Sequence, residues 1–152
     1  MNMTASMKSS DQAPALTHDQ WILALTLWRE CRGESTRGKV AAAEVIVERV
    51  RDPRWPDTIC GVCLQPWQFS CFNSKDPNAT KLPGPDDLVF PSCQDIALFV
   101  TGGDNRKEYF IDKEVKGSNH YLASWMKNSN KLPKWAQGKK FVQVGSHLFY
   151  KL

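Results

Sequence analysis

The sequence predicts a mainly helical α+β fold, with helices first and a small antiparallel sheet in the C-terminal third. Residues 17–51 carry apolar side chains at the three- and four-residue spacing of buried helix faces. The final segment, FVQVGSHLFYKL, instead has the alternation of a strand. A chain of 152 residues, of which 41% are hydrophobic and 24% charged, suits one globular core.

The first helix should begin after Thr17, because Thr17 and Gln20 have the spacing of a capping box. Apolar residues then follow on most sides of the helix, at Trp21, Ile22, Leu23, Ala24, Leu25, Leu27 and Trp28. Gly33 favours termination, so we expect this helix to end near Arg32.

A second helix is predicted from residue 35 or 36 to about residue 51. One side of it is apolar, at Val40, Ala43, Ile46, Val47 and Val50. Its alanines allow a neighbouring helix to approach closely. The Asp52-Pro53 pair should end it, since the residue before a proline disfavours helical geometry.

The segment after the second helix is rich in proline, glycine and aromatic residues. We expect a short helical turn around residues 58–64 and an extended surface excursion over residues 73–91, a candidate cleft wall. A third helix should cover residues 91–100, with Ser92 as its cap. The sheet is expected from residues 109–124 and 141–152.

The domain organisation is expected to be simple, with a flexible leader over residues 1–15 and one domain over residues 16–152. The N-terminus lacks the apolar segment of a signal peptide, and no apolar run approaches the roughly 20 residues of a membrane span. We therefore expect a protein made in the cytoplasm that does not insert into membranes.

The chain is mildly basic, with a net charge of +4 and a pI near 8.8. This balance suits an anionic polymer, such as nucleic acid, a membrane surface or an acidic cell-wall glycan, although ordinary solubility explains it as well. The sequence has no run of Lys and Arg and no nucleic-acid motif, so a nucleic-acid partner is not expected.

Five cysteines and three histidines raise the question of a metal site. The Cys60-Gly-Val-Cys63 spacing occurs in zinc knuckles, but no second pair accompanies it, and the histidines are scattered. Packed free thiols explain the cysteines better. We expect no metal and no cofactor.

Two glutamates, Glu30 and Glu34, follow the first apolar run. Burial beside Leu27 and the C-terminal end of a helix dipole would both favour a protonated Glu30, as a catalytic acid requires. The alternative is a solvated last-turn glutamate. Glu34 follows the Gly33 break, so it could instead stabilise the start of the second helix or the rim of a cleft.

Glycoside hydrolysis usually requires two carboxylates, and the nearest further candidates, Asp52 and Asp57, lie beyond the second helix. One acid is enough when the substrate supplies the nucleophile. In peptidoglycan the C6 hydroxyl of muramic acid can attack and leave a 1,6-anhydro product, while one Glu acts first as acid and then as base.

Short motifs occur in order from about residue 20 to residue 150, namely ECRGE at 30–34, Gly38, ERV at 48–50, PRWPDT at 53–58, QPWQFS at 65–70, NHY at 119–121, Trp135 and GSHLFY at 145–150. In this order they resemble the SleB-type cell-wall hydrolase family, which includes spore-cortex-lytic enzymes and phage lysins. Two positions depart from the family pattern, with Cys31 in place of an alanine and Glu48 in place of an asparagine.

The resemblance implies a helical core like that of lysozymes and lytic transglycosylases, with a small sheet appended. It also implies cleavage of the peptidoglycan glycan strand by a lytic transglycosylase or muramidase, with Glu30 as the essential acid. The short chain looks most like a phage endolysin, which accumulates in the host cytoplasm and reaches the wall through holin pores. We expect it to act as a monomer.

Further candidate site residues come from the later motifs. Gln68 could hydrogen-bond N-acetyl groups, and Ser70 could orient a water or the muramic hydroxyl; an exposed glutamine and a turn-capping serine are the alternatives. Tyr121 could bind substrate or steady Glu30, with His120 beside it, although a lone histidine is usually structural.

Among the remaining aromatic and imidazole side chains, Trp55 and Trp67 are candidates for sugar stacking, unless they pack within their loops. Phe69 should belong to the core. His147 alternates with core residues and is expected to be structural.

Two other functions remain open at this point. An amidase or peptidase that cuts the stem peptide would need zinc or a Cys/His pair, for which Cys31 or Cys71 with His120 are the candidates. A glycan-binding module without catalysis is the other alternative.

Overall fold

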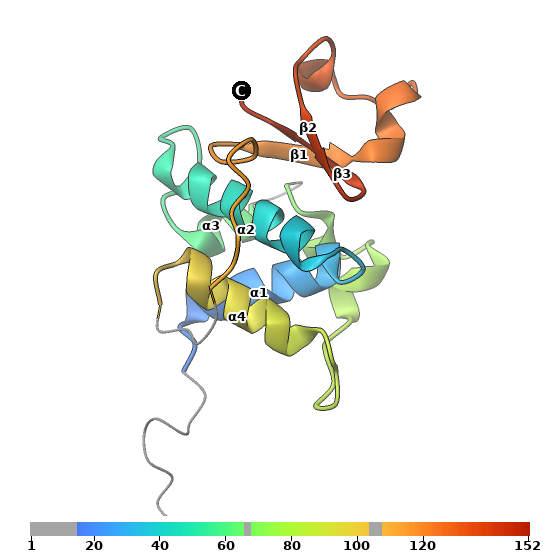
Figure 1. The fold of residues 1–152 in the computed structure, drawn as a ribbon. Coiled ribbons are helices and arrows are strands. Elements are labelled where there is room, and N and C mark those ends of the chain that lie inside the picture. Colours follow the sequence, from blue (N-terminus) through green and yellow to red (C-terminus); the bar gives the residue numbers. More distant parts are fainter. Residues whose placement is uncertain (1–14, 66–67, 104–107) are drawn as a thin grey trace, which may run out of the picture.

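A computed structural model describes residues 15–65, 68–103 and 108–152 (Figure 1). Over these ranges the helices are α1 (His18–Cys31), α2 (Thr36–Arg51), α3 (Ile59–Leu64) and α4 (Phe90–Val100), and the strands are β1 (His120–Ala123), β2 (Val142–Val144) and β3 (His147–Tyr150). This arrangement confirms the mainly helical α+β fold. Within the described ranges, no helix is long and apolar enough to cross a membrane. Most of the expected leader, residues 1–14, lies outside them.

Helix α1 begins as the sequence predicts. The Thr17 hydroxyl accepts the Gln20 amide at 3.2 Å, and the Gln20 side chain accepts the Thr17 amide at 2.9 Å. The helix ends at Cys31, with Arg32 as its C-cap. Gly33, however, does not have a positive φ. The helix therefore stops at the expected place without the left-handed glycine that we expected to stop it.

Helix α2 also matches its predicted range. The Ser35 hydroxyl accepts the Gly38 amide at 3.2 Å and caps the helix. Its apolar side is almost fully buried; Ala42 and Ala43 belong to the helical core, whereas Ala41 packs with residues of the sheet. Helix α3 begins after Thr58, whose hydroxyl accepts the Gly61 amide, so the expected helical turn is confirmed.

Helix α4 starts one residue earlier than expected and has a different cap. Ser92 lies inside the helix, where its hydroxyl donates to the Val89 carbonyl at 2.6 Å. The Asp87 carboxylate instead accepts the amides of Val89 and Phe90, at 2.9 and 2.8 Å. An ionised carboxylate at a helix start satisfies free amides and suits the helix dipole, so Asp87 takes the role predicted for Ser92.

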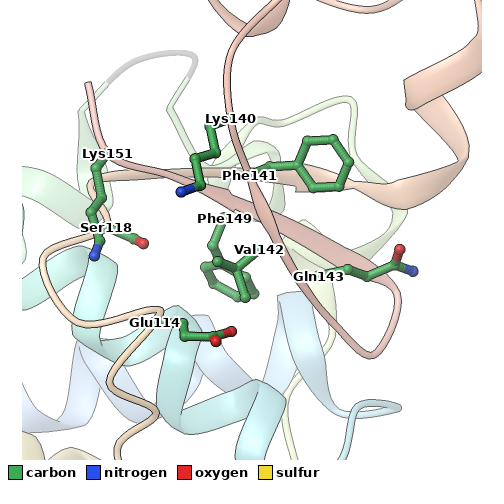
Figure 2. A pocket seen from close by; sticks show the side chains of 8 residues that line it. All are labelled: Glu114, Ser118, Lys140, Phe141, Val142, Gln143, Phe149 and Lys151. Atoms are coloured by element: carbon green, nitrogen blue, oxygen red, sulfur yellow. The ribbon is translucent and has the colours of Figure 1, made fainter.

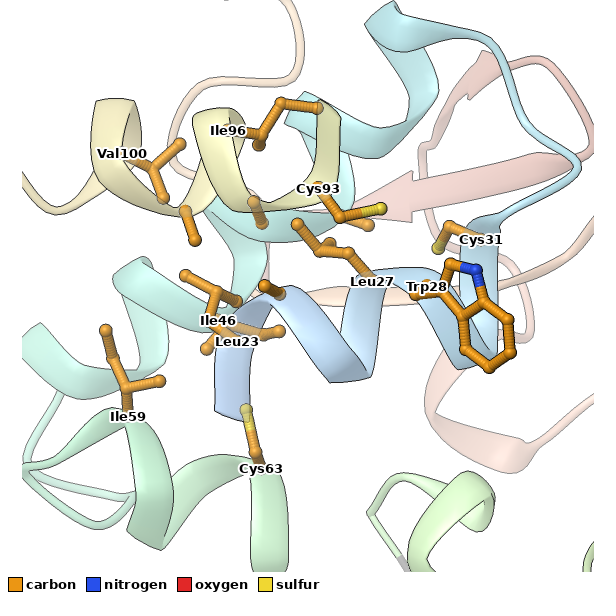
Figure 3. Close-up of a cluster of buried hydrophobic side chains, with 14 of the residues drawn as sticks. Leu23, Leu27, Trp28, Cys31, Ile46, Ile59, Cys63, Cys93, Ile96 and Val100 are labelled. Carbon is orange, nitrogen blue, oxygen red and sulfur yellow. The ribbon is translucent and has the colours of Figure 1, made fainter. Parts of the chain in front are cut away.

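The main core forms around α1, which contacts α2, α3 and α4 (Figure 3). Its members come from all four helices, and the labelled ones are Leu23, Leu27, Trp28, Cys31, Ile46, Ile59, Cys63, Cys93, Ile96 and Val100. Phe69 is 5% exposed and joins this core, as predicted. The burial of α1 on most sides explains why its sequence is apolar around most of its circumference.

The sheet is antiparallel with strand order β1-β3-β2. One face carries Tyr121 and Phe149 and packs towards the helices; the other carries Leu122, Leu148 and Tyr150, covered by residues of the 126–141 segment. Figure 1 shows the sheet beside α2.

The strand prediction is wrong for residues 109–119, the first part of the segment expected to form the sheet. It contains turns, including Gly117 at φ +88°, before β1 starts at His120. Tyr109 and Ile111 pack against the helical core. Residues 109–119 therefore resemble a strand in composition because their apolar side chains anchor a connecting segment to the core.

Candidate active site

Glu30 lies in the last turn of α1 and is partly buried. Its Oε1 accepts the backbone N–H of Cys71 at 3.2 Å. Cys71 belongs to a short 3-10 helix, Ser70–Phe72, so this bond joins the end of α1 to the loop that follows α3. The carboxyl group is thus held in a fixed place rather than extended into solvent, as a solvated last-turn glutamate would be.

Tyr121 approaches the same place from β1. Burial, followed by the proximity of Cys31 and Glu30, raises the pKa of the Tyr121 phenol well above its ordinary value. The phenol therefore stays protonated. Its ring packs 6.4 Å from the Phe69 ring and 5.1 Å from the His147 ring, between centroids. Glu30 is therefore near enough for its charge to act on the Tyr121 phenol, whereas the hydrogen bond of the phenol is with the Cys31 thiol.

Gln68 and Ser70 are exposed on the loop that carries Cys71. The Gln68 side-chain oxygen accepts a hydrogen bond from Arg49 Nη1 at 2.9 Å. Ser70 also lines a hollow of about 660 Å³, together with Leu64 and Asn73. Both residues therefore lie on the loop whose Cys71 amide binds Glu30, and Ser70 faces space that a substrate could enter.

Arg49 was not among the predicted site residues. It is 7% exposed, and its Nε donates to the Asn119 carbonyl at 2.7 Å while Nη1 holds Gln68. Its guanidinium lies over the Trp55 ring, 5.2 Å from the centroid. Arg49 follows Val45 by four positions on the apolar side of α2. A charged residue in this apolar stripe is the feature of the sequence that could have identified Arg49 as a candidate.

Glu34 is placed differently from Glu30. Its Oε1 accepts the Ser146 amide at 3.0 Å, and its Oε2 accepts the Ser146 hydroxyl at 2.7 Å. His147 Nδ1 also lies near this carboxylate, 3.2 Å from Oε1. A Cβ on Gly145 would lie 2.8 Å from Oε1. Glu34 therefore fastens the start of α2 to the β2–β3 turn.

This bonding fixes the charge of Glu34. Burial raises the pKa of its carboxyl group, but the hydrogen bonds from the Ser146 hydroxyl and amide outweigh it, and the pKa falls below its ordinary value. Glu34 stays ionised at neutral pH. A carboxylate that stays ionised and already accepts two hydrogen bonds is a poor proton donor.

His120 does not join Glu30. Adjacent residues of a strand point to opposite faces, so Tyr121 faces the helices while His120 faces Trp135, at 4.7 Å between ring centroids. Burial, and then the cations Arg49 and Arg54, lower the pKa of His120 to about 4. Its Nδ1 lies 2.8 Å from the Asn119 side-chain oxygen. His120 is thus a neutral, packed ring on the far face of the sheet.

All five cysteines are free. Burial, and then the charge of Glu30, raises the pKa of both Cys31 and Cys71, so both remain thiols. Among the described residues, no group of three or more His, Cys, Asp or Glu side chains is placed to hold a metal ion. The guanidinium groups of Arg49 and Arg54 both lie over the Trp55 ring, and Trp67 lies outside the described residues.

Residues 33–150 match a family described as Cell Wall Hydrolase, in a range that starts just after Glu30. Two curated relatives are spore cortex-lytic enzymes. The one from Halalkalibacterium halodurans is 34% identical over 68 residues, 43% of this chain and 21% of the relative. The one from Bacillus subtilis is 38% identical over 53 residues, 35% of this chain and 17% of the relative. The matches thus span about a fifth of each relative's length.

Two solved structures share the fold. The catalytic domain of the Bacillus cereus SleB protein has a TM-score of 0.64 and 21% identity, and the match covers 96% of this chain and 99% of that one. The catalytic domain of the germination-specific lytic transglycosylase SleB from Bacillus anthracis has a TM-score of 0.62 and 22% identity, covering 92% and 100%. The expected phage origin stays a prediction.

Because the family match covers most of the residues, the chain belongs to the cell wall hydrolase family.

Proposed function

We propose that this protein cleaves the glycan strand of bacterial peptidoglycan between N-acetylmuramic acid and N-acetylglucosamine, as a lytic transglycosylase. The observation that carries the proposal is the different placement of the two glutamates. The Glu34 carboxylate accepts two hydrogen bonds from Ser146 and stays ionised, whereas the Glu30 carboxyl group accepts one, from the Cys71 amide. Of these two glutamates, Glu30 is therefore the one left available for proton transfer. Family membership supports the same chemistry, as does the likeness to the Bacillus anthracis SleB domain, which belongs to a lytic transglycosylase.

In the proposed reaction, the protonated Glu30 carboxyl donates its proton to the glycosidic oxygen as the bond from that oxygen to the muramic C1 breaks. The Glu30 carboxylate then takes the proton of the muramic C6 hydroxyl, whose oxygen bonds to C1. The products are a 1,6-anhydromuramic end and a free N-acetylglucosamine hydroxyl. If water replaces the C6 hydroxyl, the same acid gives the muramidase reaction.

The surrounding residues take supporting roles in this scheme. Tyr121 is a neutral, buried phenol bonded to the Cys31 thiol and close enough for the Glu30 charge to act on it, and we assign it to holding the surroundings of Glu30 in place. Gln68, oriented by Arg49, and Ser70 present polar groups at the surface of the loop that holds Glu30. We assign them to binding of the N-acetyl and hydroxyl groups of the glycan.

The amidase or peptidase alternative was expected to use Cys31 or Cys71 with His120, and the described residues do not bring these together. A different pair does meet, Cys60 Sγ and His18 Nδ1 at 3.6 Å, but burial raises the pKa of Cys60 to about 11. Cys31 and Cys71 remain thiols, whereas a catalytic cysteine needs a lowered pKa. His120, the expected partner, points to the opposite face of the sheet. These placements favour glycan cleavage.

The product of digestion tests the proposal. Purified peptidoglycan treated with the protein should release muropeptides that end in anhydromuramic acid, each one water lighter than the hydrolysed form by mass spectrometry. Reducing muramic ends would indicate a muramidase. Free stem peptides would indicate an amidase and would overturn the proposal, and binding without any release would indicate a glycan-binding module.

A further inference from the structure

The charges of the chain are divided unevenly along its length. Glu114 is the last acidic residue; the 38 residues that follow, 115–152, contain lysines but no acid and no arginine. These lysines are Lys116, Lys127, Lys131, Lys134, Lys139, Lys140 and Lys151. The C-terminal part, which forms the whole sheet, is therefore strongly positive, although the net charge of the chain is only +4.

A hollow of about 640 Å³ opens in this part of the molecule (Figure 2). Its apolar lining comes from Phe141, Val142 and Phe149, and its charged lining from Glu114, Lys140 and Lys151. Figure 2 shows Lys140 and Lys151 extending on one side and the Glu114 carboxylate on another, around Val142 and Phe149. None of Glu30, Gln68, Ser70 and Tyr121 lines this hollow, although its Phe149 packs against Tyr121 at 5.6 Å between ring centroids.

The three charged groups of the hollow have no ion-pair partner within the described ranges. Two cations and one anion thus surround an apolar surface without neutralising one another. Such a lining suits a ligand with both a carboxylate and an ammonium group and an aliphatic part between them. A simple polyanion would be attracted by the lysines but repelled by Glu114.

Strand β2 forms one wall of the hollow and lies at the edge of the sheet, with β3 on its other side. An edge strand offers backbone N–H and C=O groups to an extended peptide. The hollow therefore combines the elements of a peptide-binding site: an open strand edge, an apolar floor and charges of both signs.

We infer that this hollow binds the stem peptide of peptidoglycan, a short peptide with free carboxylates and, in walls that contain a diamino acid, a free side-chain amine. The carboxylates lie against Lys140 and Lys151, and the amine lies against Glu114. The identity of the peptide rests on the proposed function, which supplies the wall as substrate; the zwitterionic character of the site rests on the hollow alone.

The test uses a free synthetic stem tripeptide, L-alanyl-γ-D-glutamyl-meso-diaminopimelic acid, titrated into the isotopically labelled full chain and followed by amide NMR. We expect saturable shifts centred on Val142 and Phe149. Lys140→Gln with Lys151→Gln should weaken binding at least about tenfold. The matched control, Lys131→Gln with Lys134→Gln, removes the same charge from the same acid-free part but outside the hollow, and should change affinity less than twofold.

A second arm tests the role of Glu114. Acetylation of the peptide amines should weaken binding to the wild type, and Glu114→Gln should remove the preference for the unacetylated peptide. Each variant must keep the dispersed amide spectrum of the wild type, so that lost binding is not lost folding.

Several results would overturn the inference. These are the absence of saturable shifts at millimolar peptide, equal weakening by the two double variants, and equal binding of the acetylated peptide. Inorganic polyphosphate that binds more tightly than the peptide, with equal sensitivity to both double variants, would show a general polyanion surface instead. Because the peptide contains no glycan, these readouts stand even if glycan cleavage by Glu30 proves wrong.

Discussion

Replacing Glu34 with alanine tests whether this residue fastens the helical part of the molecule to the sheet. The variant loses two hydrogen bonds, from the Ser146 amide at 3.0 Å and the Ser146 hydroxyl at 2.7 Å. Hydrogen bonds to charged groups contribute about 1.5–3 kcal/mol each, but water can replace part of this because Ser146 is exposed. We therefore expect a loss of about 2 kcal/mol in the free energy of unfolding, or about 4–8 °C in Tm.

The matched control for this variant is Glu48→Ala. The Glu48 carboxylate lies 3.8 Å from Arg51 Nη1, in a pair whose side chains are 34% and 64% exposed. Exposed pairs of this kind contribute little, so we expect a change within about 0.5 kcal/mol. Urea unfolding of both variants at pH 7 makes the comparison. Coinciding curves would refute the role given to Glu34.

The same variant predicts a pH dependence. The folded pKa of Glu34 is lowered, so its contribution to stability is complete above the ordinary value of 4.5 and is lost as the pH falls through the folded pKa. The difference between wild type and Glu34→Ala should therefore shrink as the pH is lowered from 7 towards 3. A difference that stays constant over this range would contradict the assignment.

Three other changes follow from the same contacts. Gly145→Ala should lower Tm more than Gly138→Ala, although φ is positive at both, because only at Gly145 does a Cβ approach Glu34, at 2.8 Å from Oε1; equal losses would contradict this. Arg49→Met leaves two acceptors without their donor and should cost about 2–3 kcal/mol in urea unfolding, with partial recovery in Arg49→Lys. Iodoacetamide at pH 7 should leave wall lysis unchanged, because the raised pKa keeps Cys71 a thiol; loss of lysis that tracks alkylation of Cys71 would restore the cysteine alternative.

The helices could be predicted from the sequence because their signals are local. The capping box at Thr17, the cap at Ser35 and the apolar spacing of α1 and α2 all lie within a few turns of the residues that they organise. The cap of α4 was missed because Ser92 and Asp87 both fit a helix start. Only the structure shows the Asp87 carboxylate on the first amides.

The site could be predicted only in part. The distinction between Glu30 and Glu34 followed from the Gly33 break, but the partner of Glu34, Ser146, lies 112 positions away and gave no local signal. The placement of His120 could have been predicted from the sequence, because alternation along a strand turns its side chain away from that of Tyr121. Arg49 could also have been predicted as a candidate residue, because it is a charged residue within the apolar side of α2.

The central claim is that Glu30 is the one acid of the reaction, and its replacement by glutamine tests this most directly. Gln keeps the shape and can still accept the Cys71 amide, but it cannot donate the proton that the leaving oxygen needs. Lysis of purified peptidoglycan by Glu30→Gln should fall at least about 100-fold, while Glu48→Gln stays near wild type and both variants unfold at the wild-type Tm. Wild-type lysis by a folded Glu30→Gln variant would contradict the account.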